Sequence, residues 1–141
     1  MIFWKKIRPR RIRLWRKKNL NIGSEGEEVA AGFLKEKGYK ILVRNFKNLR
    51  GRQLGEIDII AEKNKEIVFI EVKTRELEKY GKTLPEENIT FSKLRKLNKI
   101  ANSYIKMNNL WNYPYHFDAV SVWLSHDFKK FEIKHIEDIF I

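Results

Sequence analysis

The chain of 141 residues contains no cysteine. That absence excludes disulfide bridges, thiolate nucleophiles and cysteine-type zinc sites. No run approaches the roughly eighteen apolar residues of a membrane-spanning helix, and the basic start lacks the apolar segment of a signal peptide. The sequence also lacks a Gly-rich phosphate loop and a Gly-x-Ser-x-Gly elbow, which argues against an NTPase and a serine hydrolase. We therefore expect a single cytoplasmic domain with one hydrophobic core.

Positive charge is concentrated at the start of the chain. Lys and Arg number 30 against 18 Asp and Glu, a net charge of +12, and residues 1–20 contain no acid. We divide the chain into a basic flexible arm, 1–20, and a domain, 21–141. Nucleic acid is the favoured partner, because a basic arm neutralises phosphates and releases counterions. Anionic lipid and a plain solubilising or ribosome-adhering tail are the alternatives. The arginines expected to contact phosphates are Arg10, Arg11, Arg13 and Arg16.

The hydrophobic pattern predicts an α/β domain. A helix should begin at Ser24, with Glu27 completing a capping box, and end at Lys37-Gly38. Strands are expected at 39–46, 56–61 and 67–73, the last two joined by a hairpin turn at 63–65. After a surface loop at 74–88, apolar residues at helical spacing predict a helix over 91–108. Two further strands at 117–123 and 131–135 give the order α-β-β-β-α-β-β, which predicts a mixed β-sheet flanked by helices.

The predicted hairpin carries a candidate metal site. Side chains alternate along a strand, so Glu71 and Lys73 share one face. If the hairpin pivots at the middle of its turn, Asp58 lies opposite Glu71 with Cβ atoms about 4.5–5.5 Å apart. Two such carboxylates repel each other unless a cation lies between them. Mg²⁺ or Mn²⁺ suits these oxygen ligands, and the main-chain carbonyl of Val72 could complete the shell.

Lys73 would lie near any water that the metal holds, as phosphodiester hydrolysis requires. The alternative is a solvated strand face, which is the commoner reason for a Glu-x-Lys pattern. Here, however, the charges interrupt dense Ile, Val and Phe runs, where an unpaired charge is costly.

An ordered set of motifs carries a family resemblance over about residues 22–125. These motifs are Gly23-x-x-Gly26-Glu27-Glu28-x-Ala30, Gly38-Tyr39, Arg44-Asn45, Gly55-Glu56-Ile57-Asp58-Ile59-Ile60-Ala61, Val68-Phe69-Ile70-Glu71-Val72-Lys73-Thr74-Arg75, Tyr80-Gly81, Lys93 and Phe117-Asp118. The chain resembles the YraN family of predicted nucleases. More broadly, it resembles the restriction-endonuclease-like PD-(D/E)xK superfamily, which includes archaeal Holliday junction resolvases.

The resemblance implies a restriction-endonuclease-like core with Asp58 and Glu71 as metal ligands and Lys73 as the catalytic lysine. It also implies that Glu27 assists at the same site, with helix capping as the alternative role. Thr74 and Arg75 would touch phosphates, as would Lys93 if it faces the site rather than solvent. The resemblance favours DNA, in particular branched DNA, and a homodimer. It has two departures: His116 stands where Arg would be expected, and the arm lies outside the shared region.

Two groups of residues receive structural interpretations. His116, His126 and His135 are dispersed and lack metal-ligand spacing, so we expect surface or structural roles. Trp111, Tyr113 and Tyr115 surround a proline, and we expect them to cover one edge of the core, with base stacking as the alternative.

The sequence thus favours a metal-dependent nuclease. A non-catalytic nucleic-acid-binding module on the same scaffold is the main alternative, and a membrane-surface protein is the third.

Overall fold

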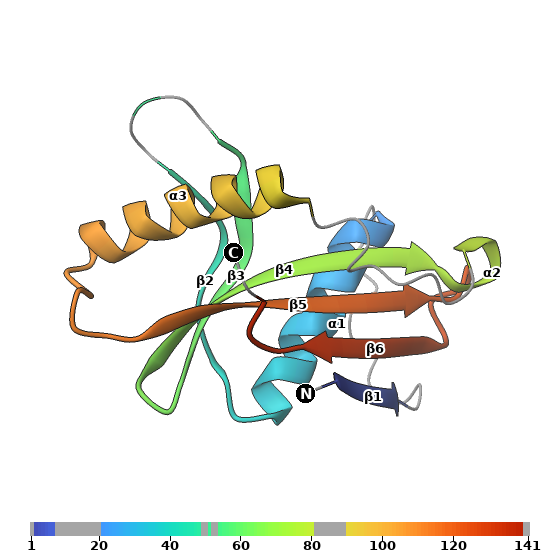
Figure 1. Ribbon diagram of the computed structural model, residues 1–141. Coiled ribbons are helices and arrows are strands. Elements are labelled where there is room, and N and C mark those ends of the chain that lie inside the picture. Colours follow the sequence, from blue (N-terminus) through green and yellow to red (C-terminus); the bar gives the residue numbers. More distant parts are fainter. Residues whose placement is uncertain (1, 8–20, 49–50, 52–53, 81–89, 140–141) are drawn as a thin grey trace.

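The computed structural model describes residues 2–7, 21–48, 51, 54–80 and 90–139 (Figure 1). Its centre is a six-stranded sheet in the order β1-β6-β5-β4-β3-β2. The strands are β1 (Ile2–Ile7), β2 (Lys40–Lys47), β3 (Glu56–Lys63), β4 (Glu66–Glu76), β5 (Tyr115–Leu124) and β6 (Phe131–Ile136). The helices are α1 (Ile22–Glu36), α2 (Leu77–Tyr80) and α3 (Phe91–Met107). β4 and β5 run parallel and the other neighbours are antiparallel, so the sheet is mixed.

The predicted fold class is confirmed, because α1, β2, β3, β4, α3, β5 and β6 follow the expected order. The prediction of a loop from residue 74 was wrong in its first part. β4 continues to Glu76, which pairs with Leu124 of β5, and α2 follows directly. The strand is longer than expected because its parallel partner extends equally far. Residues 81–88 of that predicted loop lie outside the described part of the chain. Within the described residues, no helix combines the length and apolarity needed to cross a membrane.

The N-terminus of α1 differs from the predicted capping box. Asn21 is the N-cap, and its Oδ1 accepts the N–H of Ser24 at 2.8 Å. The helix therefore begins three residues earlier than a cap at Ser24 would place it. Glu27 then lies in the second turn, too far from the N-terminus to cap the helix. At the other end, Lys37 is the C-cap and Gly38 adopts a φ of +90°, so the predicted helix end is confirmed.

The register predicted for the β3–β4 hairpin is also confirmed. The backbone pairs run from Lys63↔Glu66 to Ile59↔Ile70. The two turn residues, Asn64 and Lys65, have φ values of 53° and 60°. Positive φ at both positions gives a tight turn whose twist matches that of the strands.

The first residues of the arm form a strand. Ile2–Ile7 pairs antiparallel with β6, from Ile2↔Ile136 to Ile7↔Phe131. The prediction of a flexible arm was therefore wrong for these six residues. The physical reason is that β6 would otherwise leave its outer N–H and C=O groups unpaired at the sheet edge. The arginines assigned to phosphate contacts, Arg10, Arg11, Arg13 and Arg16, lie outside the described residues.

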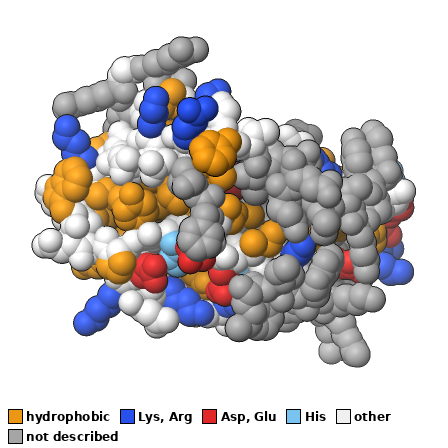
Figure 2. All heavy atoms as spheres, in the orientation of Figure 1, with side chains coloured by type: hydrophobic (Ala, Val, Ile, Leu, Met, Phe, Trp, Pro, Cys, Tyr) orange, Lys and Arg blue, Asp and Glu red, His pale blue; other side chains and the backbone are white. Residues whose placement is uncertain are grey.

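The prediction that the aromatic loop between α3 and β5 covers one edge of the core is confirmed only for Tyr115, whose ring lies beside those of Phe69 and Phe117. Trp111 is 65% exposed and Tyr113 is 41% exposed, and hydrophobic side chains reach the surface where α3 gives way to β5 (Figure 2, left). Tyr115 is half exposed, although its ring centroid lies 5.8 Å from that of Phe69. Tyr104 belongs to the nearby core, and Leu110 packs against it.

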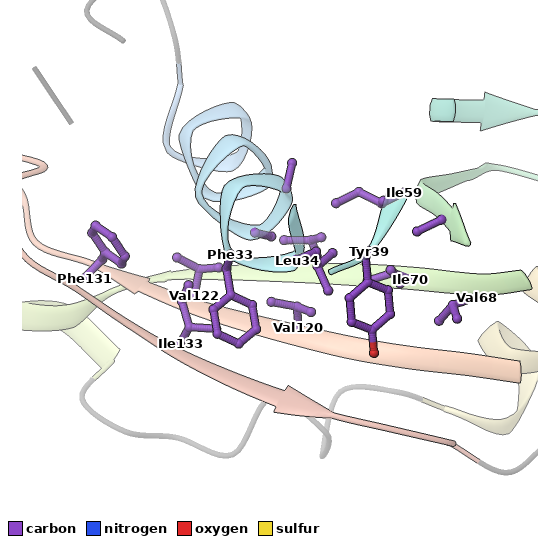
Figure 3. Close-up of a cluster of buried hydrophobic side chains, with 14 of the residues drawn as sticks. Phe33, Leu34, Tyr39, Ile59, Val68, Ile70, Val120, Val122, Phe131 and Ile133 are labelled. Carbon is purple, nitrogen blue, oxygen red and sulfur yellow. The ribbon is translucent and has the colours of Figure 1, made fainter. Parts of the chain in front are cut away.

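Two hydrophobic layers cover the sheet, one on each face. The first lies between α1 and the sheet, and Figure 3 shows Phe33 and Leu34 of α1 directed at Val120 and Val122 of β5. The second lies between α3 and the opposite face, around Phe69. Along β4 the α1 layer receives Val68, Ile70 and Val72. The intervening residues therefore face α3, and these include Glu71 and Lys73.

Candidate metal centre

Asp58 lies where β3 and β4 part, one residue beyond the last backbone pair, Ile59↔Ile70. Its Oδ2 accepts the N–H of Val72 at 2.7 Å, and the residue is only 8% exposed. The carboxylate thus takes the place of a backbone acceptor at the end of the ladder. In an antiparallel strand the N–H and C=O of one residue point to the same side, so the carbonyl of Val72 also faces β3.

Three carboxylates converge at this point. One oxygen each from Glu27 of α1 and from Glu56 and Asp58 of β3 lie within 4.8 Å of one another. We call these three residues the acidic cluster. Burial raises the pKa of Asp58 to about 7, and the charges of Glu71, Glu27 and Glu56 add to that effect against the hydrogen bond from Val72. Arg44 lies 3.8 Å from Glu27 and Lys47 lies 3.9 Å from Glu56, but burial and neighbouring negative charge at Asp58 exceed what its own hydrogen bond offsets.

Glu27 reaches the acidic cluster because α1 approaches β4 closely. A Cβ atom on Gly26 would overlap the side chain of Thr74, so only glycine permits this contact. Asn45 of β2 then links the two glutamates, since its Nδ2 donates to Glu27 at 3.2 Å and to Glu56 at 3.4 Å. The geometry of the cluster is thus set by three elements, α1, β2 and β3.

Glu71 lies beside the acidic cluster and is held by two lysines. Its Oε1 contacts Nζ of Lys93 from α3 and lies 3.6 Å from Nζ of Lys73. Burial lowers the pKa of Lys73, and the nearby Lys93 lowers it further. Burial is the largest single influence on Lys93 and acts to lower its pKa, but the hydrogen bonds to Glu71 and Lys73 and the charges of Glu71 and Asp58 together outweigh burial, and the pKa is raised. Positive charge from β4 and α3 therefore borders a concentration of negative charge.

The donor set fits a hard divalent cation. It consists of carboxylate oxygens, with the Val72 carbonyl on the same side, and no His belongs to the acidic cluster. Mg²⁺ and Mn²⁺ prefer such oxygen ligands. A cation would also relieve the mutual repulsion that raises the pKa of Asp58.

The structure brings together most of the residues assigned to the site from the sequence. Asp58, Glu71, Lys73, Lys93 and Glu27 are neighbours. Arg75 follows Lys73 on the same face of β4. Thr74 is the exception, because its side chain packs against Gly26 on the α1 face rather than beside Glu71.

Two residues of the site carried no assigned role in the sequence analysis. Glu56 had a readable signal, since it lies two residues before Asp58 and therefore on the same strand face. Asn45 had none, because its φ of 53° and its bridging position depend on how β2 meets α1. Its identity does suit this conformation, since Asn tolerates positive φ better than most residues.

A second group of ligand-type side chains lies on the α1 face of the sheet. His116 and His135 are distant in sequence, but both meet Asp118. His135 Nε2 lies 2.7 Å from Asp118 Oδ2, and His116 Nε2 lies 3.1 Å from Oδ1. The N–H of Asp138 also donates to Oδ1 at 2.9 Å. We call His116, Asp118 and His135 the histidine cluster.

The outer nitrogens of both histidines in this cluster are also occupied. Lys37 Nζ lies 2.9 Å from His135 Nδ1, and Glu66 Oε1 lies 2.6 Å from His116 Nδ1. The hydrogen bonds from His116 and His135 outweigh burial and lower the pKa of Asp118 to about 2. The bond to Asp118 likewise outweighs burial and, with Glu66, raises the pKa of His116 to about 9. The prediction that the histidines are dispersed is therefore corrected for these two, whereas His126 lies exposed in a turn.

Comparison with known proteins identifies the family. Residues 26–122 match the family described as "Uncharacterised protein family UPF0102". The chain belongs to the UPF0102 family. A UPF0102 protein of Clostridium beijerinckii is 44% identical over 125 residues, which cover 89% of this chain and 97% of that protein.

Two further UPF0102 relatives come from other genera. The protein of Caldanaerobacter subterraneus is 46% identical over 104 residues, covering 74% of this chain and 80% of that protein. The protein of Caldicellulosiruptor saccharolyticus is 41% identical over 119 residues, covering 84% and 96%. The family predicted from the motifs, a YraN-like one, is thus confirmed.

The UPF0102 match covers the two clusters unequally. All of the acidic cluster, together with Glu71 and Lys93, lies inside residues 26–122. His135 of the histidine cluster lies beyond its end. The matched region of this UPF0102 protein therefore contains a complete candidate metal centre but only part of the second group.

Proposed function

We propose that this UPF0102 protein is a metal-dependent nuclease that hydrolyses phosphodiester bonds of nucleic acid. The observation that carries the proposal is the convergence of the Glu27, Glu56 and Asp58 carboxylates beside Glu71, with Lys73 and Lys93 next to them. Such an arrangement places a group of carboxylates that can bind a cation next to positively charged side chains. Attack of water on a phosphodiester requires both.

Asp58 and Glu71 would hold Mg²⁺ or Mn²⁺, with Glu27, Glu56 and the Val72 carbonyl as further ligands. When bound, the metal supplies Lewis acidity toward a phosphoryl oxygen and lowers the pKa of a coordinated water. Asn45 and the close packing of Gly26 on Thr74 keep Glu27 in place for this role.

The two lysines would supply the positive charge that the reaction needs near the phosphate. Lys73 is partly exposed and adjoins Glu71, so its ammonium can hold the attacking water and offset negative charge on the phosphate. Lys93 neutralises Glu71 from α3. When Glu71 ligates a cation, that ammonium becomes available to a phosphate oxygen.

The substrate is proposed to be DNA rather than RNA, with branched or structured DNA as the preferred form. The charge of +12 supports a polyanionic substrate in general. The choice of DNA, its branched form and a homodimer rest on the resemblance to junction resolvases. Arg75 and the basic arm would supply affinity for the backbone that is independent of sequence.

A cleavage assay with Mg²⁺ or Mn²⁺ tests the proposal. End-labelled duplex, single-stranded, flapped and four-way-junction DNA and a structured RNA would be compared. We expect Asp58→Asn and Lys73→Met to lower the rate by on the order of a hundredfold or more while nucleic-acid binding is retained. The matched controls are Glu62→Gln, on the same strand as Asp58, and Lys40→Met, an exposed lysine of β2.

The outcomes separate the two hypotheses. Cleavage that both site variants lose and both controls retain would support the nuclease. Binding of every substrate without cleavage of any would instead favour the non-catalytic binding module. Cleavage that survives both substitutions would show that the site is placed wrongly or that the activity belongs to a contaminant.

A further inference from the structure

The outer face of α3 carries a straight row of cationic and amide side chains. Arg95, Lys99, Asn102 and Lys106 recur at intervals of four, three and four residues and are all exposed. This spacing places them on one ridge of the helix. The opposite face, which includes Leu97, Ile100 and Tyr104, is buried against the sheet. We call Arg95, Lys99 and Lys106 the basic ridge.

The basic ridge is not balanced by acids. Residues 91–117 include five Lys and Arg and no Asp or Glu. An ordinary solvated helix mixes both signs, since opposite charges three or four residues apart stabilise it. Figure 2 shows Lys and Arg side chains gathered along the upper edge of the molecule, over α3. A surface of one sign along a whole helix suits a polyanion that lies along it.

Exposed aromatic rings lie at the C-terminal end of the basic ridge. Trp111 is 65% exposed and Tyr113 is 41% exposed. Their backbone is held by hydrogen bonds from Leu110 N–H to the Ile105 carbonyl and from Tyr113 N–H to the Leu110 carbonyl, both 3.0 Å. Leu110 itself packs against the core. The two rings are therefore presented to solvent from an ordered turn, as a stacking platform for bases requires.

The other end of α3 lies at the candidate metal centre, because Lys93 of its first turn pairs with Glu71. From Arg95 to Lys106 the helix rises by about 16 Å. At a spacing of about 3.4 Å per nucleotide in a stacked strand, the basic ridge spans roughly five phosphates. The basic ridge and the aromatic platform thus form one outer surface along α3. The first turn of the same helix reaches the metal centre on its sheet-facing side through Lys93.

We propose that this surface is a track for an unpaired strand of nucleic acid, with its phosphates on the basic ridge and its bases stacked on Trp111 and Tyr113. The bases must be unpaired because a duplex conceals their faces from side-chain rings. The inference rests on the proposed function only for what happens at the metal centre. It specifies the substrate further, as nucleic acid with a single-stranded segment of several nucleotides beside the cleavage point.

Equilibrium binding without metal tests the track. The full chain would be titrated in EDTA against a labelled oligothymidylate of about 20 nucleotides, at several salt concentrations, with fluorescence anisotropy as the readout. Replacing Arg95, Lys99 and Lys106 together by Gln should make the slope of log K against log salt less negative by about 2, since each single-strand phosphate contact contributes about 0.7. Trp111→Ala should weaken binding by about fivefold to a hundredfold without changing that slope. Trp111→Phe should restore most of the affinity.

The control triple variant replaces Lys40, Lys129 and Lys130 by Gln, which removes the same charge from other exposed positions. It should change the slope by less than the ridge variant does. Heparin, a polyanion without bases, should bind Trp111→Ala and the parent equally. All substituted side chains are exposed, so melting temperatures should stay close to that of the parent.

Equal slope changes in both triple variants, or full oligothymidylate affinity in Trp111→Ala, would overturn the track. These measurements involve no cleavage, so their result is independent of whether the metal centre is active. Failure of cleavage with this binding pattern intact would count against the nuclease proposal alone.

Discussion

The acidic cluster and the histidine cluster both gather metal-ligating side chains on the same sheet, yet they differ in how their charge is compensated. Each has an aspartate at its centre. Asp118 receives hydrogen bonds from two histidines and from a backbone N–H. Asp58 receives one backbone N–H and is surrounded by other carboxylates. The pKa of the first is lowered to about 2 and that of the second is raised to about 7.

The difference shows that closeness of ligand-type side chains does not by itself make a metal site. Three such groups lie within 4.8 Å of one another in both places, with Glu137 as the third beside Asp118 and His135. In that region the protein supplies its own cations, Lys37 and the protonated His116. At the acidic cluster, Lys73 and Lys93 pair with Glu71, Arg44 lies 3.8 Å from Glu27, and Lys47 lies 3.9 Å from Glu56. Within the described residues Asp58 itself forms no ion pair, so its charge is the one left for a cation from solution. We therefore assign a structural role to the histidine cluster and a chemical role to the acidic one.

The largest effect on stability should come from matched substitutions of the two aspartates. Asp118→Asn removes a buried charge on which His116 and His135 depend, so the free energy of unfolding should fall by about 3–5 kcal/mol. Asp58→Asn removes a repelled charge and keeps an oxygen for the Val72 N–H, so the free energy of unfolding should be unchanged or higher. Urea unfolding measures both. A large loss in Asp58→Asn would mean that its charge is already compensated within the protein.

Two alanine substitutions in α1 should distinguish the effect of displacing the helix from the effect of changing its intrinsic stability. Gly26→Ala would force α1 away from Thr74, which should cost about 1–3 kcal/mol of unfolding free energy. It should also lower cleavage by on the order of tenfold, because Glu27 moves with the helix. Gly32→Ala is the control, since a Cβ there meets nothing within 4 Å. It should raise stability by about 0.5–1 kcal/mol and leave cleavage unchanged. Equal effects of the two substitutions would contradict the proposed packing constraint.

The histidine cluster should give stability a distinctive pH dependence. The pKa of His116 rises from 6.5 to about 9, so its contribution is complete below pH 6.5 and is lost as pH rises through 9. The pKa of Asp118 falls from 3.8 to about 2, so its contribution is present above pH 3.8 and is lost as pH falls through 2.

Unfolding free energy measured from pH 6 to pH 10 should therefore decline, by at most about 3 kcal/mol, and His116→Gln should flatten that decline. His126→Gln, at an exposed site, should leave the decline in place. A decline of full size in His116→Gln would place its origin elsewhere in the molecule.

The smallest effect expected is a thermal shift with Mg²⁺. A cation that binds the folded chain about tenfold above its dissociation constant adds about 1.4 kcal/mol, which corresponds to a rise of a few degrees in melting temperature. Asp58→Asn should abolish the rise, whereas Asp118→Asn should retain it from a lower starting temperature. If Asp118→Asn abolished the rise in melting temperature and Asp58→Asn retained it, the roles given to the two clusters would be reversed.

The acidic cluster was largely predictable because much of it depends on local geometry. Alternation along two strands and a two-residue turn placed Asp58 beside Glu71, and the motifs added Glu27. The same kind of local pattern predicted the helix over 91–108, which the structure confirms as Phe91–Met107. What could not be foreseen was Asn45 as a bridge, because its position depends on the packing of β2 against α1.

The histidine cluster was not predictable, since it depends on the registers of two strand pairs at once. Asp118 meets His135 only because β5 pairs with β6, and His116 meets Glu66 across the parallel β4–β5 pair. Composition gave no sign of either pairing. The exposure of Trp111 was likewise not predictable, because it depends on which side chains pack against the core at that edge, and these are Tyr104 and Leu110.

The single backbone N–H that each aspartate accepts turns both clusters into spectroscopic reporters. The amide proton of Val72 lies on Asp58, and that of Asp138 lies on Asp118. An amide resonance responds to the charge of the oxygen it donates to, so a cation arriving at Asp58 should move the Val72 signal. The Asp138 signal, whose acceptor already has its protein partners, should stay where it is. The molecule thus contains a probe of metal occupancy and an internal reference for it, both observable in one NMR spectrum without any added label beyond the nitrogen isotope.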